Sequence, residues 1–110
     1  MLIYKILRPA EWRDLQSAGT TLGSADDRAD GFVHLSTAAQ VPGTLARRFA
    51  AERDLVLLAV DAGAAELRWE PSRGGALFPH LYRPLALADV RWTRPIADGP
   101  DGPVAPAGLE

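Results

Sequence analysis

The side chains best suited to chemistry in this chain are its two histidines, His34 and His80, together with Glu70. A histidine titrates near neutral pH, and a glutamate does so when its surroundings raise its pKa, so each can transfer a proton. We predict these three residues as catalytic candidates. Either His80 or Glu70 fits the acid–base role.

The first candidate segment, Asp-Gly-Phe-Val-His-Leu-Ser-Thr at residues 30–37, places His34 near the end of an expected strand and just before a helix. Helix N-termini expose unpaired N–H groups and partial positive charge, which suit an anionic ligand group. Ser36 and Thr37 are therefore candidate ligand-binding residues. The alternative is that Ser36 or Thr37 only caps the helix and His34 is a half-buried residue of the sheet.

The second candidate segment is a glycine-containing loop that leads into an extended stretch. Arg73 offers the planar guanidinium that holds phosphate or carboxylate, and Gly74 and Gly75 allow the backbone to approach a ligand closely. Tyr82 is a candidate wall for ring stacking. These four are predicted ligand-binding residues. The alternative is a solvated ion pair between Glu70 and Arg73, worth about 0–1 kcal/mol, on a turn that the glycines only shape.

Several kinds of chemistry are disfavoured by what the sequence lacks. The chain has 110 residues and no cysteine, which excludes disulfides, thiolate zinc sites and cysteine nucleophiles. The two histidines are not in the His-x-x-x-His spacing of a metal site, so no metal is expected. No Gly-x-Ser-x-Gly elbow indicates a serine nucleophile.

Charge and hydropathy indicate which partners to expect. The net charge is -2 and the arginines are spread along the chain, so we expect no nucleic-acid partner. Lys5 interrupts the apolar N-terminal run, which argues against a secretory signal. The longest apolar run, residues 55–60, is too short to cross a bilayer, so we expect no membrane contact and a cytoplasmic location. We also expect a small-molecule ligand, and we expect the protein to be a monomer or a weak dimer.

The elements that must position these residues form one α+β domain over residues 1–96, followed by a flexible Pro/Gly-rich tail over residues 97–110. Expected strands cover residues 2–7, 32–35, 55–60, 66–70, 77–82 and 90–93, and expected helices cover residues 9–18 and 38–52.

Local signals refine this assignment. The apolar run 55–60 predicts a central strand covered on both faces. Pro42 inside the second helix predicts a kink or a restart near Thr44. Residues 19–31 are polar and predict a loop. Pro79 predicts that its strand lies at an edge or is irregular, and the alternation around Trp69 predicts that this side chain faces the core.

Four motifs together resemble a bacterial family known as domain of unknown function 952. They are Ile-Tyr-Lys-Ile, Asp-Gly-Phe-Val-His-Leu-Ser-Thr, Asp-Leu-Val-Leu-Leu-Ala-Val-Asp, and Leu-Arg-Trp-Glu-Pro-Ser-Arg-Gly-Gly-Ala-Leu-Phe-Pro-His-Leu-Tyr. The resemblance covers about residues 2–96 and implies a small cytoplasmic α+β protein with no established activity.

The resemblance also implies kinship with the ADP-ribosyltransferase-like superfamily, whose members bind NAD or ADP-ribose compounds in a small split sheet, mixed or antiparallel, with two to three helices. His34 then resembles the strand residue that holds a ribose, and Tyr82 stands in for the nicotinamide-stacking tyrosine. The chain departs from that pattern because no Glu-x-Glu or Gln-x-Glu lies near its last strands. His80 lies nearer the expected late position than Glu70 does.

Three functional hypotheses follow. The leading one is an enzyme or pseudo-enzyme that handles NAD or an ADP-ribose-like nucleotide, with NAD as candidate substrate and no metal. The second is a small-molecule hydrolase or isomerase that uses His34 and His80 as an acid–base pair. The third is a non-catalytic module that binds a metabolite in the same pocket.

Overall fold

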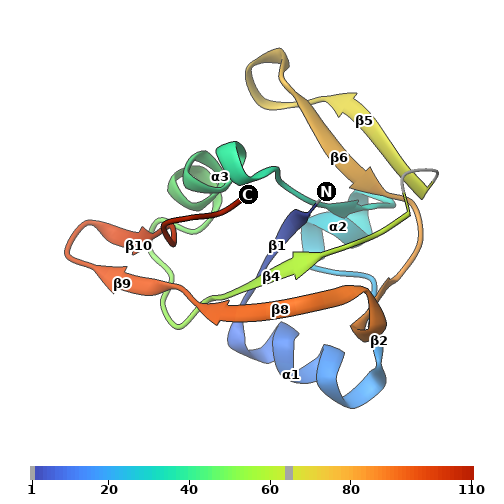
Figure 1. Cartoon of the computed structure of the whole chain (residues 1–110), viewed down its shortest axis with the longest axis horizontal. Coiled ribbons are helices and arrows are strands. Elements are labelled where there is room, and N and C mark those ends of the chain that lie inside the picture. The colour runs from blue at the N-terminus through green and yellow to red at the C-terminus, as the bar shows by residue number, and fades with distance from the viewer. Residues whose placement is uncertain (1, 64–65) are drawn as a thin grey trace.

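Two three-stranded antiparallel sheets form the framework of this α+β protein (Figure 1). The computed structural model describes residues 2–63 and 66–110, and its Cα atoms extend over 38 × 35 × 28 Å. Three α-helices and two small two-stranded sheets complete the described part of the chain. The predicted α+β class is confirmed, and the strand pairs within these residues are antiparallel.

The first sheet has the order β1-β4-β8, with β1 at Ile3–Leu7, β4 at Val56–Val60 and β8 at Val90–Pro95. The apolar run of β4 therefore occupies the centre, as its composition predicts. A register irregularity between Ala59 and Val60 bends the pairing of β4 with β8.

Two helices cover opposite faces of this sheet (Figure 1). Helix α1, Pro9–Ala18, begins with a proline at its first turn and ends at Gly19, whose φ of 80° is the left-handed conformation that glycine favours. Helix α3, Val41–Arg48, follows the short 3-10 turn η1, Ala38–Gln40. The expected helix is interrupted, but α3 begins at Val41, before Pro42, rather than near Thr44, and it holds the proline in its first turn, where no hydrogen bond is lost.

Each face of the sheet has its own apolar core. The core on the α1 side contains Ile3, Leu7, Leu15, Val33, Leu35, Leu58, Val60, Leu81 and Leu85. The core on the α3 side contains Tyr4, Ile6, Val41, Leu45, Phe49, Leu55, Leu57, Ala59 and Ile96. Both faces of β1 and β4 are thus covered, which fixes β1 firmly beneath the site described below.

The second sheet has the order β3-β6-β5, with β3 at Val33–His34, β6 at Leu77–Leu81 and β5 at Leu67–Pro71. Its strand β6 is central, so the edge position predicted from Pro79 is wrong. The strand tolerates the proline because β3 ends before it, while the Pro79 carbonyl still accepts from the Leu35 N–H at 3.1 Å.

The two sheets meet at a β-bridge between Tyr4 of β1 and Ser36, which follows β3. The Tyr4 N–H donates to the Ser36 carbonyl at 2.7 Å, and the Ser36 N–H donates back at 2.9 Å. Beyond this bridge the sheets diverge, and β5 and β6 rise away from β1 in Figure 1. The opening between the sheets is where the polar residues gather.

The loop predicted over residues 19–31 is wrong, because this segment contains strand β2, Thr20–Thr21, and helix α2, Ala25–Asp30. Strand β2 pairs with β7, Leu85–Ala86. Helix α2 is held by reciprocal bonds at its start rather than by an apolar stripe, so periodicity did not reveal it. The Trp69 side chain is also exposed rather than in the core.

The C-terminal segment contains an antiparallel hairpin of β9, Ala97–Gly99, and β10, Gly102–Val104. This differs from the flexible tail expected over residues 97–110. Contacts between β10 and α3, and the packing of Ala105 and Leu109 on the second core, hold the segment despite its prolines. In the described residues, no helix has the length and apolar character needed to cross a membrane.

Candidate functional site

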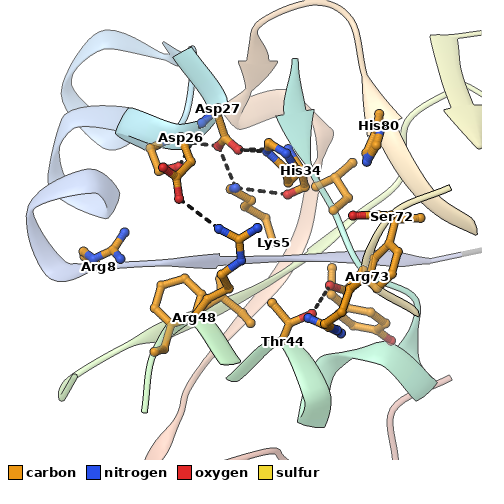
Figure 2. Close-up of a pocket in the computed structure, with 17 residues that line it drawn as sticks. Lys5, Arg8, Asp26, Asp27, His34, Thr44, Arg48, Ser72, Arg73 and His80 are labelled. Carbon is orange, nitrogen blue, oxygen red and sulfur yellow. Dashed lines mark hydrogen bonds and ion pairs between the residues drawn. The ribbon is translucent and has the colours of Figure 1, made fainter. Parts of the chain in front are cut away.

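A pocket of about 110 Å³ lies where the two sheets separate (Figure 2). Strand β1 forms its floor, the histidine-bearing strands β3 and β6 form one wall, and helices α2 and α3 contribute side chains around it. The structure thus gathers residues from β1, α2, β3, α3 and β6 at the opening between the sheets. Concave polar sites of this kind are the usual location of ligands.

Asp27 is the buried centre of the pocket's polar network, with 2% of its surface exposed. Its Oδ2 accepts from Lys5 Nζ at 2.7 Å and from the Ser24 N–H at 2.9 Å. Its Oδ1 accepts from the His34 N–H at 3.1 Å and lies 2.5 Å from His34 Nδ1. Burial alone would raise the pKa of Asp27, but the bond from His34 and the charge of Lys5 hold that pKa well below its ordinary value.

Lys5 links strand β1 of the first sheet to His34 of the second sheet. Its side chain is buried within β1, and Nζ donates to the His34 carbonyl at 3.0 Å as well as to Asp27. A buried ammonium needs such partners because isolated charge is very costly away from water. Lys5 and Asp27 therefore fix the position of His34 relative to β1.

The local sequence around Gly23 makes room for the Asp27 carboxylate. Ser24 Oγ accepts from the Asp27 N–H at 3.2 Å, which completes a reciprocal cap at the start of α2. Gly23 has φ of +92°, and a Cβ there would lie 1.9 Å from Asp27 Oδ2. Only glycine fits this position with the network intact.

Replacing Gly23 with Ala should therefore destabilise the fold more than replacing Gly19 with Ala. Both glycines have positive φ, but nothing lies within 4 Å of a Cβ at Gly19. Strain alone should cost Gly19→Ala about 1–2 kcal/mol. Gly23→Ala should lose about 1.5–3 kcal/mol more, because the displaced carboxylate gives up charge-assisted hydrogen bonds. Urea unfolding of the two variants measures the difference, and equal losses would contradict the tight fit at Gly23.

His34 is held between two carboxylates. Besides the Nδ1 contact with Asp27, its Nε2 lies 3.0 Å from Asp30 Oδ2. Both ring nitrogens of His34 are thus engaged within the protein.

His80 faces His34 across the sheet, because the two residues are direct partners in the pairing of β3 with β6. Their ring centroids are 5.3 Å apart, and the Phe32 ring stacks on His80 at 4.1 Å. His80 Nδ1 lies 2.7 Å from Glu70 Oε1, which also accepts from the Tyr82 hydroxyl at 2.6 Å. These contacts form a Tyr–Glu–His chain that ends at the pocket.

The far end of this chain is unsatisfied. His80 is 4% exposed, and in the described part of the protein its Nε2 is the one buried side-chain nitrogen or oxygen without a hydrogen-bond partner. Hydrogen bonds from Tyr82 and then from His80 lower the pKa of Glu70, so this carboxylate is ionised near neutral pH. His80 Nδ1 must then be the donor to Glu70. In the neutral ring, Nε2 carries a lone pair that a ligand can use.

Arginines also border the pocket. Arg73 lies over the Phe78 ring at 5.0 Å, and no described residue pairs with its guanidinium through an ion pair or hydrogen bond. Burial lowers the pKa of Arg73, and the charges of Arg47 and Arg48 lower it further. Arg48 Nη1 lies 3.1 Å from Asp26 Oδ2 across the pocket in Figure 2. Among the arginines that line the pocket, Arg73 therefore carries positive charge that no described acidic side chain compensates.

Four of the residues predicted from the sequence line this pocket: His34, Ser36, Arg73 and His80. Ser36 is buried, and its Oγ lies 2.9 Å from Thr44 Oγ1. Glu70 and Tyr82 do not line the pocket but act on it through His80.

Three further predicted ligand-binding residues, besides Tyr82, lie outside the pocket lining. The Thr37 N–H donates to Gln40 Oε1 at 3.0 Å, so this residue is committed to the start of η1. Gly74 and Gly75 have positive φ and belong to the exposed 3-10 turn η3, Arg73–Gly75. Their contribution is to position the arginine.

Sequence reasoning did not identify Lys5, Asp27 and Arg48 as site residues. A lysine in the middle of an apolar strand was a usable signal, because a buried ammonium requires an acidic partner. Among residues 2–63 and 66–110, no group of three or more histidine, cysteine or carboxylate side chains is placed to hold a metal ion.

Comparison with known proteins places the chain among proteins without an assigned activity. Residues 6–93 match the family described as "Protein of unknown function (DUF952)". A crystal structure of the protein CC0527 from Caulobacter crescentus has 48% sequence identity and a TM-score of 0.89, covering 94% of each chain. The solution structure of the same protein has 49% identity and a TM-score of 0.82, covering 93% of this chain and 90% of that one. No curated protein matches.

Proposed function

The chain belongs to the DUF952 family, and we propose that it binds a small molecule carrying an anionic group and a hydroxyl, on which His80 acts as general base. The observation that carries this proposal is the buried, unpartnered Nε2 of His80. A buried polar atom left unpaired costs about 1–3 kcal/mol, so a ligand or water that pairs with it would recover this energy.

The Tyr–Glu–His chain supports a role in proton transfer. With Nδ1–H donating to Glu70, Nε2 accepts a proton from a hydroxyl or water, and the carboxylate stabilises the imidazolium that forms. Tyr82 holds Glu70 in position through its hydroxyl. Glu70 and Tyr82 are therefore positioning residues, and His80 is the group that would touch the ligand.

Arg73 is the reason for proposing that the ligand carries an anionic group. Its guanidinium has the planar donors that bind phosphate or carboxylate in a fork, and no described acidic side chain occupies them. The same pocket thus offers one cation for an anion and one lone pair for a hydroxyl. A sugar phosphate has both groups on one small framework.

The ribose phosphate portion of an ADP-ribose-like nucleotide, NAD included, is the ligand class that we propose. The pocket volume of about 110 Å³ is smaller than the roughly 300–1,000 Å³ typical of larger ligands. The phosphate and ribose would occupy the pocket, while the remaining groups extend over its rim. His80 takes the ribose contact in this arrangement, because both ring nitrogens of His34 already face carboxylates.

Thermal unfolding against a ligand panel tests the proposal. The panel contains ribose 5-phosphate, ADP-ribose, NAD, ATP, nicotinamide and glutathione. A ligand at one hundred times its Kd should stabilise the fold by about 2.7 kcal/mol, which raises Tm by roughly 10 °C. We expect this shift for ligands that combine ribose and phosphate, and its loss in Arg73→Ala.

Arg13→Ala is the matched control, because Arg13 is an exposed arginine that does not line the pocket. It should keep the full shift. No shift with any phosphate-bearing member of the panel would overturn the proposed ligand class. Ligand consumption, followed by NMR of the bound compound, then separates an enzyme from a module that binds without turnover.

A further inference from the structure

We infer that the anionic group is a phosphate dianion held between Arg48 and Arg73, and that Asp26 occupies Arg48 until the phosphate binds. This inference rests on the proposed function and specifies its ligand. It assigns a binding role to Arg48, on helix α3, and a competing role to Asp26, on helix α2.

The position of the ion pair between Asp26 and Arg48 allows a ligand anion to replace Asp26. The two residues come from different helices, both border the pocket, and their side chains are 71% and 56% exposed. Exposed pairs of this kind contribute little to stability, so breaking one requires little free energy. A ligand phosphate can therefore replace the carboxylate of Asp26 on the Arg48 guanidinium.

The other cations of the pocket are not available in this way. Lys5 is paired with buried Asp27, and Arg8 donates through Nε and Nη2 to Glu52 at 2.6 and 2.7 Å. Exchange of Asp26 thus frees the guanidinium of Arg48 in the same pocket as Arg73, which has no acidic partner among the described residues.

Two neighbouring guanidinium groups favour a doubly charged anion. Arg48 and Arg73 line the same pocket, and the pKa of Arg73 is lowered first by burial and then by the charges of Arg47 and Arg48. A phosphate monoester dianion would neutralise both Arg48 and Arg73 and remove their mutual repulsion. A carboxylate supplies only one charge. The pocket should therefore select a sugar phosphate monoester over a sugar carboxylate.

Isothermal titration with ribose 5-phosphate, and with ribonate as the carboxylate probe, tests the exchange. Asp26→Asn should tighten ribose 5-phosphate binding by about 2- to 5-fold, because the internal competitor is lost. Arg48→Ala should weaken it by about 10-fold or more. Asp14→Asn makes the same change in net charge on α1, away from this pocket, and should leave the Kd unchanged.

The outcomes separate this inference from the proposed function. If wild type binds ribose 5-phosphate, Arg73→Ala weakens it, and Asp26→Asn and Arg48→Ala match wild type, the exchange at Arg48 is wrong while the proposed function stands. If ribonate binds as tightly as ribose 5-phosphate, the selection of a dianion is wrong. If wild type binds neither probe nor any phosphate-bearing compound of the panel, the proposed function itself fails.

Discussion

Asp27→Ala is expected to lower the free energy of unfolding by about 3–5 kcal/mol, because it leaves the buried ammonium of Lys5 without its countercharge. The same change removes the acceptor for the His34 ring and for two backbone N–H groups. A domain of this size has about 5–15 kcal/mol of stability in total, so the loss is a large fraction of it. Urea unfolding followed by circular dichroism measures the change.

The neighbouring residue provides the control for this prediction. Asp26→Ala also removes a carboxylate from α2 and breaks an ion pair, but its partner Arg48 is exposed to water. Its cost should be about 0–1 kcal/mol. If Asp27→Ala costs no more free energy of unfolding than Asp26→Ala, the Asp27 network does not stabilise the fold. If Asp27→Ala does not fold, Asp27→Asn, which keeps the volume and one acceptor oxygen, should still unfold at lower urea than wild type.

The regular elements of the fold were predictable because their apolar patterns are strong. Strand β4 is a continuous apolar run, β1 is apolar apart from Lys5, and α1 begins with Pro9 and ends before Gly19, as its sequence indicates. Helix α2 was missed because the inward-facing side chain of this short helix is the charged Asp27. The β9–β10 hairpin was missed because its proline and glycine content resembles that of a loose tail.

The candidate site was predictable in its residue types but not in its connections. His34 and His80 stand out as the only histidines, yet their direct pairing depends on the register of two strands far apart in the chain. The partner of Lys5 was equally hidden, because three aspartates, Asp26, Asp27 and Asp30, lie in the same segment. Only the packing of α2 against β3 selects Asp27 for the buried position.

The second large effect is expected at His80, and it should fall on function rather than on stability. Phe in place of His80 preserves the flat ring that stacks on Phe32 and removes the unpartnered Nε2. The loss of the bond to Glu70 and the relief of the buried unsatisfied Nε2 act on stability in opposite directions and largely offset each other. The free energy of unfolding should therefore remain within about 1 kcal/mol of wild type.

Turnover should respond very differently. Removal of a general base lowers kcat by about 100- to 10,000-fold, so His80→Phe should abolish measurable consumption of any ligand that wild type converts. Its affinity for ribose 5-phosphate should fall by about 10-fold, since a hydrogen bond to the ligand is lost while Arg73 remains. Titration calorimetry gives the affinity, and NMR of the reaction mixture gives the rate.

His34→Phe is the matched comparison, because the same substitution on the facing strand removes a ring bonded to the buried carboxylate of Asp27. It should lower the free energy of unfolding by about 1.5–3 kcal/mol, since a charge-assisted bond is broken. The two histidines would then be distinguished by what each loses, stability at His34 and ligand chemistry at His80. A His80→Phe variant that keeps wild-type affinity and turnover would remove His80 from the reaction, and a variant that unfolds as readily as His34→Phe would make its role structural.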